Sequence, residues 1–171
     1  LVPRDGQAMH STFRIETRTD IPRQVGFAGS SAIVVACIQG LAQYFGVSLD
    51  KDEIALQSLW VETKRLGVSA GILDRVVQVY EAPIFVDAKS VPAKTRVLRG
   101  CRWADFFVSY DLRLAGESGA TAHNDMHTRF DAGEREVVQT MTEIGACATE
   151  GLRALDAGQL TEFGRLMDRN F

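Results

Sequence analysis

The sequence contains no apolar run that approaches the roughly 18 residues a membrane-spanning helix needs. It also lacks an excess of basic residues, because 19 Lys and Arg stand against 22 Asp and Glu, for a net charge of −3. We therefore expect neither a membrane nor nucleic acid among its partners. No secretory signal is visible at the N-terminus. The three cysteines, Cys37, Cys101 and Cys147, are far apart and form no Cys-x-x-Cys pair. They are typical of reduced thiols in a cytoplasmic protein.

What the chain does have is enough apolar content to build a core. Of its 171 residues 46% are hydrophobic, which suffices for one large domain or two small ones. The most informative segment is Ile21–Cys37, with the sequence IPRQVGFAGSSAIVVAC. Its Gly/Ser turn opens directly into an apolar helix, and the free N–H groups and dipole at such a junction favour a phosphate. No Lys-Ser/Thr pair closes the glycine run, so this is not a Walker A loop.

Hydrophobic periodicity predicts the remaining elements. Apolar and polar residues alternate over Ser11–Thr19, which indicates a half-buried strand. Ser30 is placed to cap a helix that runs to about Phe45, and Gly46 is placed to end it. The further predictions, in chain order, are a helix that starts at an Asp50–Glu53 capping box and reaches Leu66, a helix Ile72–Tyr80, a strand Ile84–Val86, an irregular domain boundary over Lys89–Gly100, a strand Phe106–Tyr110, a loop Ala115–Ala122, and helices Glu134–Leu155 and Gln159–Phe171.

The segment Pro22–Ala32, Pro-x3-Gly-Phe-Ala-Gly-Ser-Ser-Ala, resembles the second signature motif of the GHMP small-molecule kinases. It has one residue more between its first glycine and Gly-Ser-Ser than the usual form, and it is most similar to the glucuronokinase-like sugar kinases. Leu66–Tyr80 resembles the family's segment with the catalytic aspartate. The resemblance extends over residues 11–171 through three later blocks, which are Ser118-Gly119 followed by His123, Glu143-Ile144-Gly145, and Leu166–Phe171.

This resemblance implies an α+β fold in two layers. Residues 1–90 would belong to a ribosomal-protein-S5-like, ATP-binding N-terminal domain, and residues 101–171 would begin a ferredoxin-like C-terminal domain. The family's first and third motifs are absent from the sequence, which therefore looks like a fragment or one chain of a nicked protein. Those two absences favour an alternative, a non-catalytic nucleotide-binding module, whereas the presence of Ser31 and Asp74 argues against it.

The resemblance also implies a binding site for ATP and Mg²⁺. Ser30 would contact phosphate, and the Ser31 hydroxyl would bind the metal. The usual carboxylate ligand lies on the helix before the catalytic segment, where Glu62 is the only nearby candidate, one position off the expected spacing. One hydroxyl and one carboxylate suffice, because Mg²⁺ keeps several waters. The residues expected to bind the nucleotide are Gly26, Gly29, Ser30, Ser31 and Ala32.

Two adjacent residues would act on the sugar. Asp74 would be the general base or orienting group for the attacking hydroxyl, although an Asp in a first helical turn often only complements the dipole. Arg75 could pair with the carboxylate of a uronic acid, and a surface salt bridge is an equal alternative. The spacing of His123 and His127 is compatible with a metal site, but a solvated helix face is the favoured interpretation.

The function expected from the resemblance is ATP- and Mg²⁺-dependent phosphorylation of a sugar hydroxyl, namely the anomeric hydroxyl of a uronic acid such as glucuronic acid. Another GHMP sugar or small-alcohol kinase is the alternative within the same class. A sugar and ATP are the expected small-molecule partners.

Overall fold

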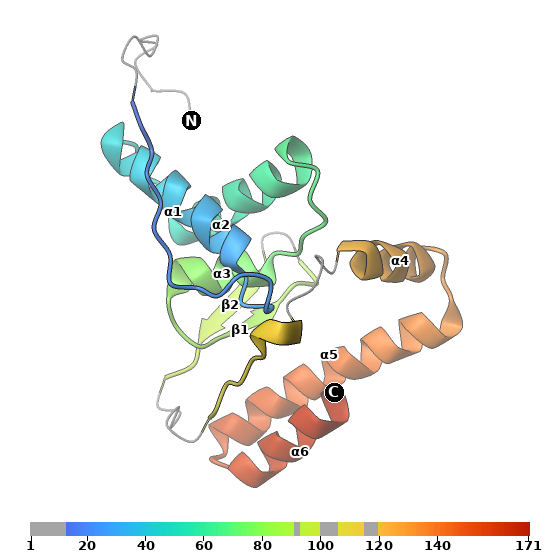
Figure 1. Ribbon diagram of the computed structural model, residues 1–171. Helices are drawn as coiled ribbons and strands as arrows, with labels where there is room; N and C mark the ends of the chain where they lie inside the picture. Colours follow the sequence, from blue (N-terminus) through green and yellow to red (C-terminus); the bar gives the residue numbers. More distant parts are fainter. Residues whose placement is uncertain (1–12, 91–92, 100–105, 115–119) are drawn as a thin grey trace. The chain divides into compact units, whose positions relative to one another are not determined.

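The computed structural model describes residues 13–90, 93–99, 106–114 and 120–171 (Figure 1). These residues combine helices with a small sheet, which is compatible with the expected α+β class. None of the described helices is long and apolar enough to cross a membrane. The elements are α1 (Gly29–Tyr44), α2 (Lys51–Trp60), a π-helical turn (Val61–Arg65), α3 (Leu73–Tyr80), β1 (Ile84–Asp87), β2 (Lys94–Val97), a 3₁₀ turn (Leu112–Leu114), α4 (Ala120–Asp131), α5 (Arg135–Asp156) and α6 (Leu160–Asn170).

Contacts divide the chain into two units. The first unit comprises Leu1–Val97 with Val108–Ser118, and the second comprises Leu98–Phe107 with Gly119–Phe171. Helices α1 to α3 and both strands thus fall in the first unit, and α4 to α6 fall in the second. The domain division at 1–90 and 101–171 stays a prediction.

The core of the first unit forms where α1, α2 and α3 pack against one another. Each helix contributes two buried apolar side chains. Those of α1 and of α3 are three residues apart and lie on one face, whereas the two of α2 are adjacent in the sequence. β1 adds Ile84 and Val86 at the edge of this cluster. Burial of each Val or Ile side chain in this cluster contributes roughly 1.5–3 kcal/mol. The buried residues are Val35 and Ile38 of α1, Ile54 and Ala55 of α2, and Val76 and Val79 of α3.

Helix α1 starts differently from the prediction. Its N-cap is Ala28, which adopts a left-handed conformation with φ of 52° and makes no side-chain cap. Ser30 is already inside the helix, so its predicted capping role is wrong. At the other end Gly46 has a φ of 64°, and the Val47 N–H donates to the Ala42 carbonyl at 2.8 Å. This left-handed glycine ends the helix as expected.

Helix α2 begins at the predicted capping box. The Asp50 carboxylate accepts from the Glu53 N–H, and the Glu53 carboxylate accepts from the Asp50 N–H, both at 2.8 Å. The helix then widens into the π-helical turn, in which the Leu66 N–H donates to the Val61 carbonyl at 3.0 Å. A single π turn inside a helix is rare and is often found at functional sites.

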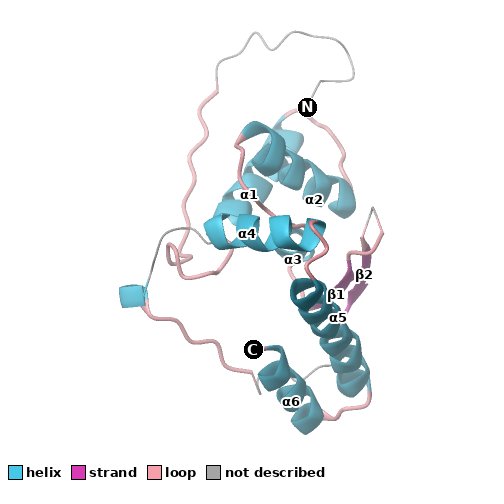
Figure 2. Ribbon diagram, turned by 90° about the vertical axis from the view of Figure 1, so that its right-hand side faces the viewer, coloured by secondary structure: helices cyan, strands magenta, loops and turns pink. Residues whose placement is uncertain are grey.

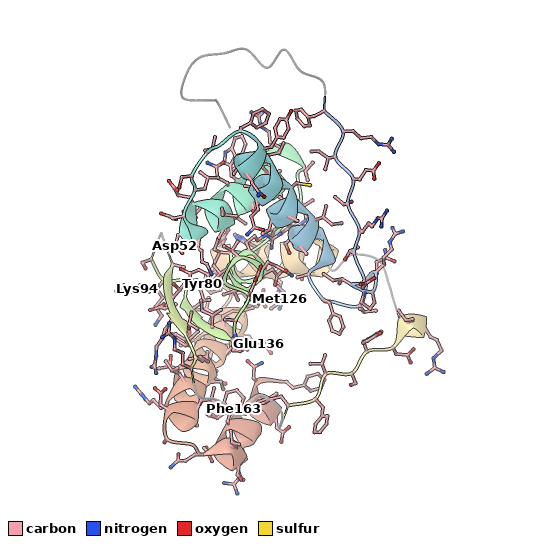
Figure 3. The ribbon with its side chains drawn as sticks, turned by 90° about the vertical axis from the view of Figure 1, so that its left-hand side faces the viewer. Asp52, Tyr80, Lys94, Met126, Glu136 and Phe163 are labelled. Carbon is pink, nitrogen blue, oxygen red and sulfur yellow. The ribbon has the colours of Figure 1, made fainter. Side chains whose placement is uncertain are left out.

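Strands β1 and β2 form a two-stranded antiparallel sheet, drawn in magenta in Figure 2. β1 was predicted, whereas β2 falls within the segment predicted to be irregular, and that prediction is wrong for Lys94–Val97. The Tyr80 hydroxyl fastens the sheet to the helices: it donates to Asp52 Oδ1 at 3.0 Å and accepts from Thr95 Oγ1 at 3.3 Å. Asp52, Tyr80 and Lys94 lie close together in Figure 3.

Two predicted strands do not form. Residues 13–19 are extended and exposed, with no strand partner among the described residues; residues 11 and 12 are outside the described ranges. A groove of about 610 Å³ separates this segment from α1, and Phe13, Ile33 and Tyr44 line it. Residues 106–110 are likewise irregular. Alternating apolar and polar residues give a segment one apolar face, but the segment becomes a β-strand only when a neighbouring strand forms hydrogen bonds with it.

The second unit is held together by close packing of α5 on α6. Gly151 is the contact point, since a Cβ there would lie 3.2 Å from the Phe163 ring; Phe163 is labelled in Figure 3. The predicted helices 134–155 and 159–171 are confirmed within one residue. The predicted loop 115–122 is wrong from Ala120 onward, where α4 begins, and residues 115–119 are outside the described ranges.

An ion pair joins α4 to the residue before α5. A hydrogen bond from Arg129 lowers the pKa of Glu134 below its usual value.

The left-handed Ala28 generates the first prediction. A residue with a Cβ loses roughly 1–2 kcal/mol in this conformation, whereas glycine does not. We expect Ala28→Gly to raise the free energy of unfolding by about 1 kcal/mol, measured by urea denaturation. The matched control is Ala36→Gly in the exposed interior of α1, which should lower it by about 1 kcal/mol. Destabilisation by both substitutions would contradict the strain assigned to Ala28.

Candidate active site

Glu62 is the centre of the candidate site. Its carboxylate lies on the π-helical turn between α2 and α3 and is only 1% exposed. Two side chains from other helices approach it. Ser30, in the first turn of α1, donates its hydroxyl to Oε1 at 3.3 Å. Arg75, in the first turn of α3, donates from Nε to Oε2 at 2.6 Å and also from Nη2 to the same oxygen. A charge this deeply buried needs such an opposite partner.

The Arg75 guanidinium is as deeply enclosed as the carboxylate, because the residue is 3% exposed. Its remaining contacts are close to its own helix. Nη1 donates to the Gly71 carbonyl at 2.8 Å and to Asp74 Oδ2 at 3.4 Å. The guanidinium therefore has partners inside the protein for each of its three nitrogens. The predicted surface salt bridge is wrong, because the ion pair is buried, and the pairing of Arg75 with a uronic-acid carboxylate stays a prediction.

Asp74 differs from its neighbours in being accessible. Its side chain is 56% exposed, although it sits beside the buried pair and in the first turn of α3. Among the described residues its side-chain contact is the long one with Arg75, at 3.4 Å, which leaves most of its lone pairs available. A carboxylate in this position can accept a proton from a molecule that approaches from solvent, while Arg75 limits its orientation.

The loop before α1 presents backbone N–H groups next to Ser30. Three alternate residues, Gln24, Gly26 and Ala28, have positive φ angles, and such alternation curls the chain so that successive N–H groups converge on an anion. A Cβ built on Gly26 would meet nothing within 4 Å, so the space before it is open. The first intrahelical N–H is that of Ala32, bonded to the Ala28 carbonyl at 3.1 Å. Hence the preceding N–H groups of α1 are free to bind a ligand.

The structure brings together four of the predicted site residues and separates one. Ser30, Glu62, Asp74 and Arg75 form one connected cluster. Ser31 is 1% exposed, and its hydroxyl donates to the Ala28 carbonyl at 2.9 Å instead of facing the cluster.

Gly29 is the first residue of α1 and precedes Ser30 directly, and Gly26 lies in the loop before the helix. The acceptor carbonyl of Gly71 was not predicted, because a backbone oxygen leaves no trace in residue type. His127 is exposed and bonded to Asp131 at 3.0 Å, whereas the His123 side chain lies outside what the structure describes.

The donor set is compatible with Mg²⁺ held jointly with a phosphate. Within the described residues there is no group of three or more His, Cys, Asp or Glu side chains that could hold a metal by themselves. The cluster instead offers one carboxylate and one hydroxyl, and the loop before α1 is open at Gly26. Mg²⁺ is commonly bound by one or two protein oxygens, with phosphates and water as its other ligands.

Comparison with known proteins finds a family match for part of the chain. Residues 3–82 match the family described as GHMP kinases N terminal domain. Two relatives from Arabidopsis thaliana align over 98% of this chain and 48% of their own length: Glucuronokinase 1 is 30% identical over 179 residues, and Probable glucuronokinase 2 is 29% identical over 180. A Galactokinase from Roseiflexus sp. (strain RS-1) is 23% identical over 187 residues, 89% of this chain and 47% of the relative.

Residues 3–82 are thus similar to the N-terminal domain of the GHMP kinases, and the chain spans about half the length of the curated relatives it matches. No solved structure matches it. The match covers the loop, Glu62 and the Asp74–Arg75 pair, all of which lie within residues 3–82.

The two loop serines should differ when each is replaced by alanine. Ser31→Ala removes a buried hydrogen bond and should lower the free energy of unfolding by about 1 kcal/mol. Ser30→Ala removes one long contact of an exposed residue, and should change the free energy of unfolding by less than about 0.5 kcal/mol. Urea denaturation of both variants measures the difference. Equal losses would contradict the division into an internal and a ligand-facing serine.

Proposed function

We propose that this chain is part of an ATP- and Mg²⁺-dependent sugar kinase, and that it carries the phosphate-binding loop, a metal ligand and the base of the reaction. The observation that supports the proposal most strongly is the position of Glu62 and Asp74. The buried Glu62 carboxylate contacts Ser30 at the start of α1 and is paired with Arg75. The accessible Asp74 carboxylate contacts the same arginine. Phosphoryl transfer needs such a pair, one to hold a metal on the phosphates and one to accept the proton.

The N–H groups of the loop and of the first turn of α1 would bind phosphate oxygens of ATP, with the helix dipole in support. Glu62 would hold the metal, and the geometry favours Ser30 over Ser31 as its hydroxyl partner because only Ser30 contacts Glu62. When bound, Mg²⁺ would neutralise phosphate charge. Ala32 would contribute through its position in the same first turn.

Asp74 would orient the sugar hydroxyl and accept its proton. The hydroxyl oxygen forms a new bond to the γ-phosphorus, the bond from that phosphorus to the bridging oxygen breaks, and ADP leaves with the electron pair. Asp74 then carries the proton that the hydroxyl has lost. General-base participation of this kind contributes roughly 10²–10⁴-fold to the rate.

For the substrate we propose a uronic acid such as glucuronic acid, phosphorylated at its anomeric hydroxyl. Support comes from the two relatives named glucuronokinases, which align over nearly the whole chain. The relative named galactokinase favours a second candidate, a GHMP kinase for another sugar. The S5-like and ferredoxin-like folds of the two parts belong to the same proposal.

The test is Asp74→Asn in the protein, assayed for ATP-dependent phosphorylation of glucuronic acid and of galactose. We expect kcat to fall by about 10²-fold or more while nucleotide binding is kept, because Asp74 is exposed and contributes little to the fold. Asp168→Asn, the same chemical change at an exposed position of α6, is the matched control and should leave kcat unaltered.

Retained turnover in Asp74→Asn would remove Asp74 from the mechanism. Nucleotide binding without phosphorylation of any sugar by the unaltered protein would instead favour the non-catalytic binding module. A preference for galactose would keep the kinase and replace the substrate.

A further inference from the structure

We propose that Arg75 is a positioning residue, which fixes the distance and orientation of Glu62 relative to Asp74, and that it does not bind the sugar. The inference rests on the proposed function for its catalytic consequence. It is carried by the internal contacts of the guanidinium, which join the two carboxylates and the backbone at the start of α3.

The first step is that the two carboxylate oxygens of Glu62 have different partners. Both Nε and Nη2 of Arg75 donate to Oε2, whereas Oε1 receives only the long contact from Ser30 at 3.3 Å among the described residues. Arg75 therefore occupies one oxygen and turns the other toward the start of α1. A carboxylate held by one oxygen keeps the second available for a metal, in the way that hydrogen-bonded outer partners orient metal ligands elsewhere.

The second step is the connection to Asp74. The guanidinium reaches from Glu62, on the π-helical turn, to Gly71 and Asp74 at the start of α3. Arg75 and Glu62 are 13 residues apart, with the irregular segment 67–71 between them. A planar, rigid fork across this segment sets the separation of two groups that the backbone alone would leave variable.

The third step is the lack of a free donor surface. Arginine has five N–H donors, and four contacts of Arg75 go to Glu62, Gly71 and Asp74. With these donors engaged, a sugar carboxylate could bind the guanidinium only in place of one of these partners, foremost Glu62. That exchange would leave Glu62 buried without its partner, at a large cost.

Two readouts test the proposal. The first needs no substrate and is a double-mutant cycle of Arg75→Met and Glu62→Gln, followed by urea denaturation of the whole protein. Arg75→Met should raise the unfolding equilibrium constant by about 100-fold or more, because it leaves a buried charge unpaired. The double variant should be less affected than the product of the two single effects by about tenfold or more. Additive effects would overturn the proposal.

The second readout uses Arg75→Lys, which keeps the charge, loses the fork and serves if Arg75→Met fails to fold. We expect the Mg²⁺ concentration for half-maximal ATP binding to rise by about tenfold or more. We also expect kcat for glucuronic acid to fall by about 10–100-fold, with the sugar KM within about twofold of its original value. Lys64→Arg on the exposed surface of the π-helical turn is the control for a Lys/Arg exchange.

The outcomes separate the alternatives. A rise in sugar KM with kcat unchanged would overturn the proposal in favour of a sugar-binding arginine. Strong coupling with unchanged Mg²⁺ dependence would also overturn it, because it would leave Arg75 a purely structural partner. If the unaltered protein phosphorylates no sugar, the proposed function fails, yet the coupling and the Mg²⁺ dependence of ATP binding still decide the role of Arg75.

Discussion

The buried ion pair of Glu62 and Arg75 is the constraint on which the first unit depends. Each of the two charges would be strongly unfavourable alone in an apolar interior, so α2 with its π-helical turn and α3 must keep a fixed relation. Ser30 brings α1 into the same arrangement. The three helices that share the apolar core therefore also share one polar centre, and packing of the core and placement of the site are two aspects of a single assembly.

Helix α1 contributes to both the core and the site, through its apolar side chains and through the polar groups of its first turn. Val35 and Ile38 face the core, whereas the first-turn N–H groups have no partner among the residues that the structure describes, and the same turn carries Ser30 toward Glu62. The left-handed Ala28 sets the direction in which the chain enters this turn. A site built on the end of a buried helix is rigid, because movement of the loop end would disturb the core packing behind it.

Local signals account for the parts of the structure that the sequence predicts well. The Asp50–Glu53 capping box, Gly46 and the apolar stripe of α5 depend only on neighbouring residues, and each lies within a residue or two of its predicted place. The segments 13–19 and 106–110 were mistaken for strands because alternation does not reveal whether a partner is present.

In the candidate site too, the residues could be predicted from local sequence, whereas their distant partners could not. Family resemblance identified Ser30, Glu62, Asp74 and Arg75 as residue types at suitable positions, but their connections could not be deduced. Ser30 was expected to cap a helix, and it bonds to a side chain 32 residues away. Arg75 was expected at the surface or on the sugar, and it is buried. Such pairings are decided by helix packing, which no single segment encodes.

The π-helical turn has a consequence for how such chains are recognised. Glu62 is one position off the spacing expected from the family resemblance, yet it still lies beside Arg75 and Ser30. A π turn holds more residues than an α turn, so a helix can absorb a single-residue insertion by widening locally. The Gly-Phe-Ala-Gly loop, which has one residue more than the usual motif, contains the left-handed Ala28. Searches that demand fixed intervals between motif residues will overlook insertions that the backbone can accommodate in this way.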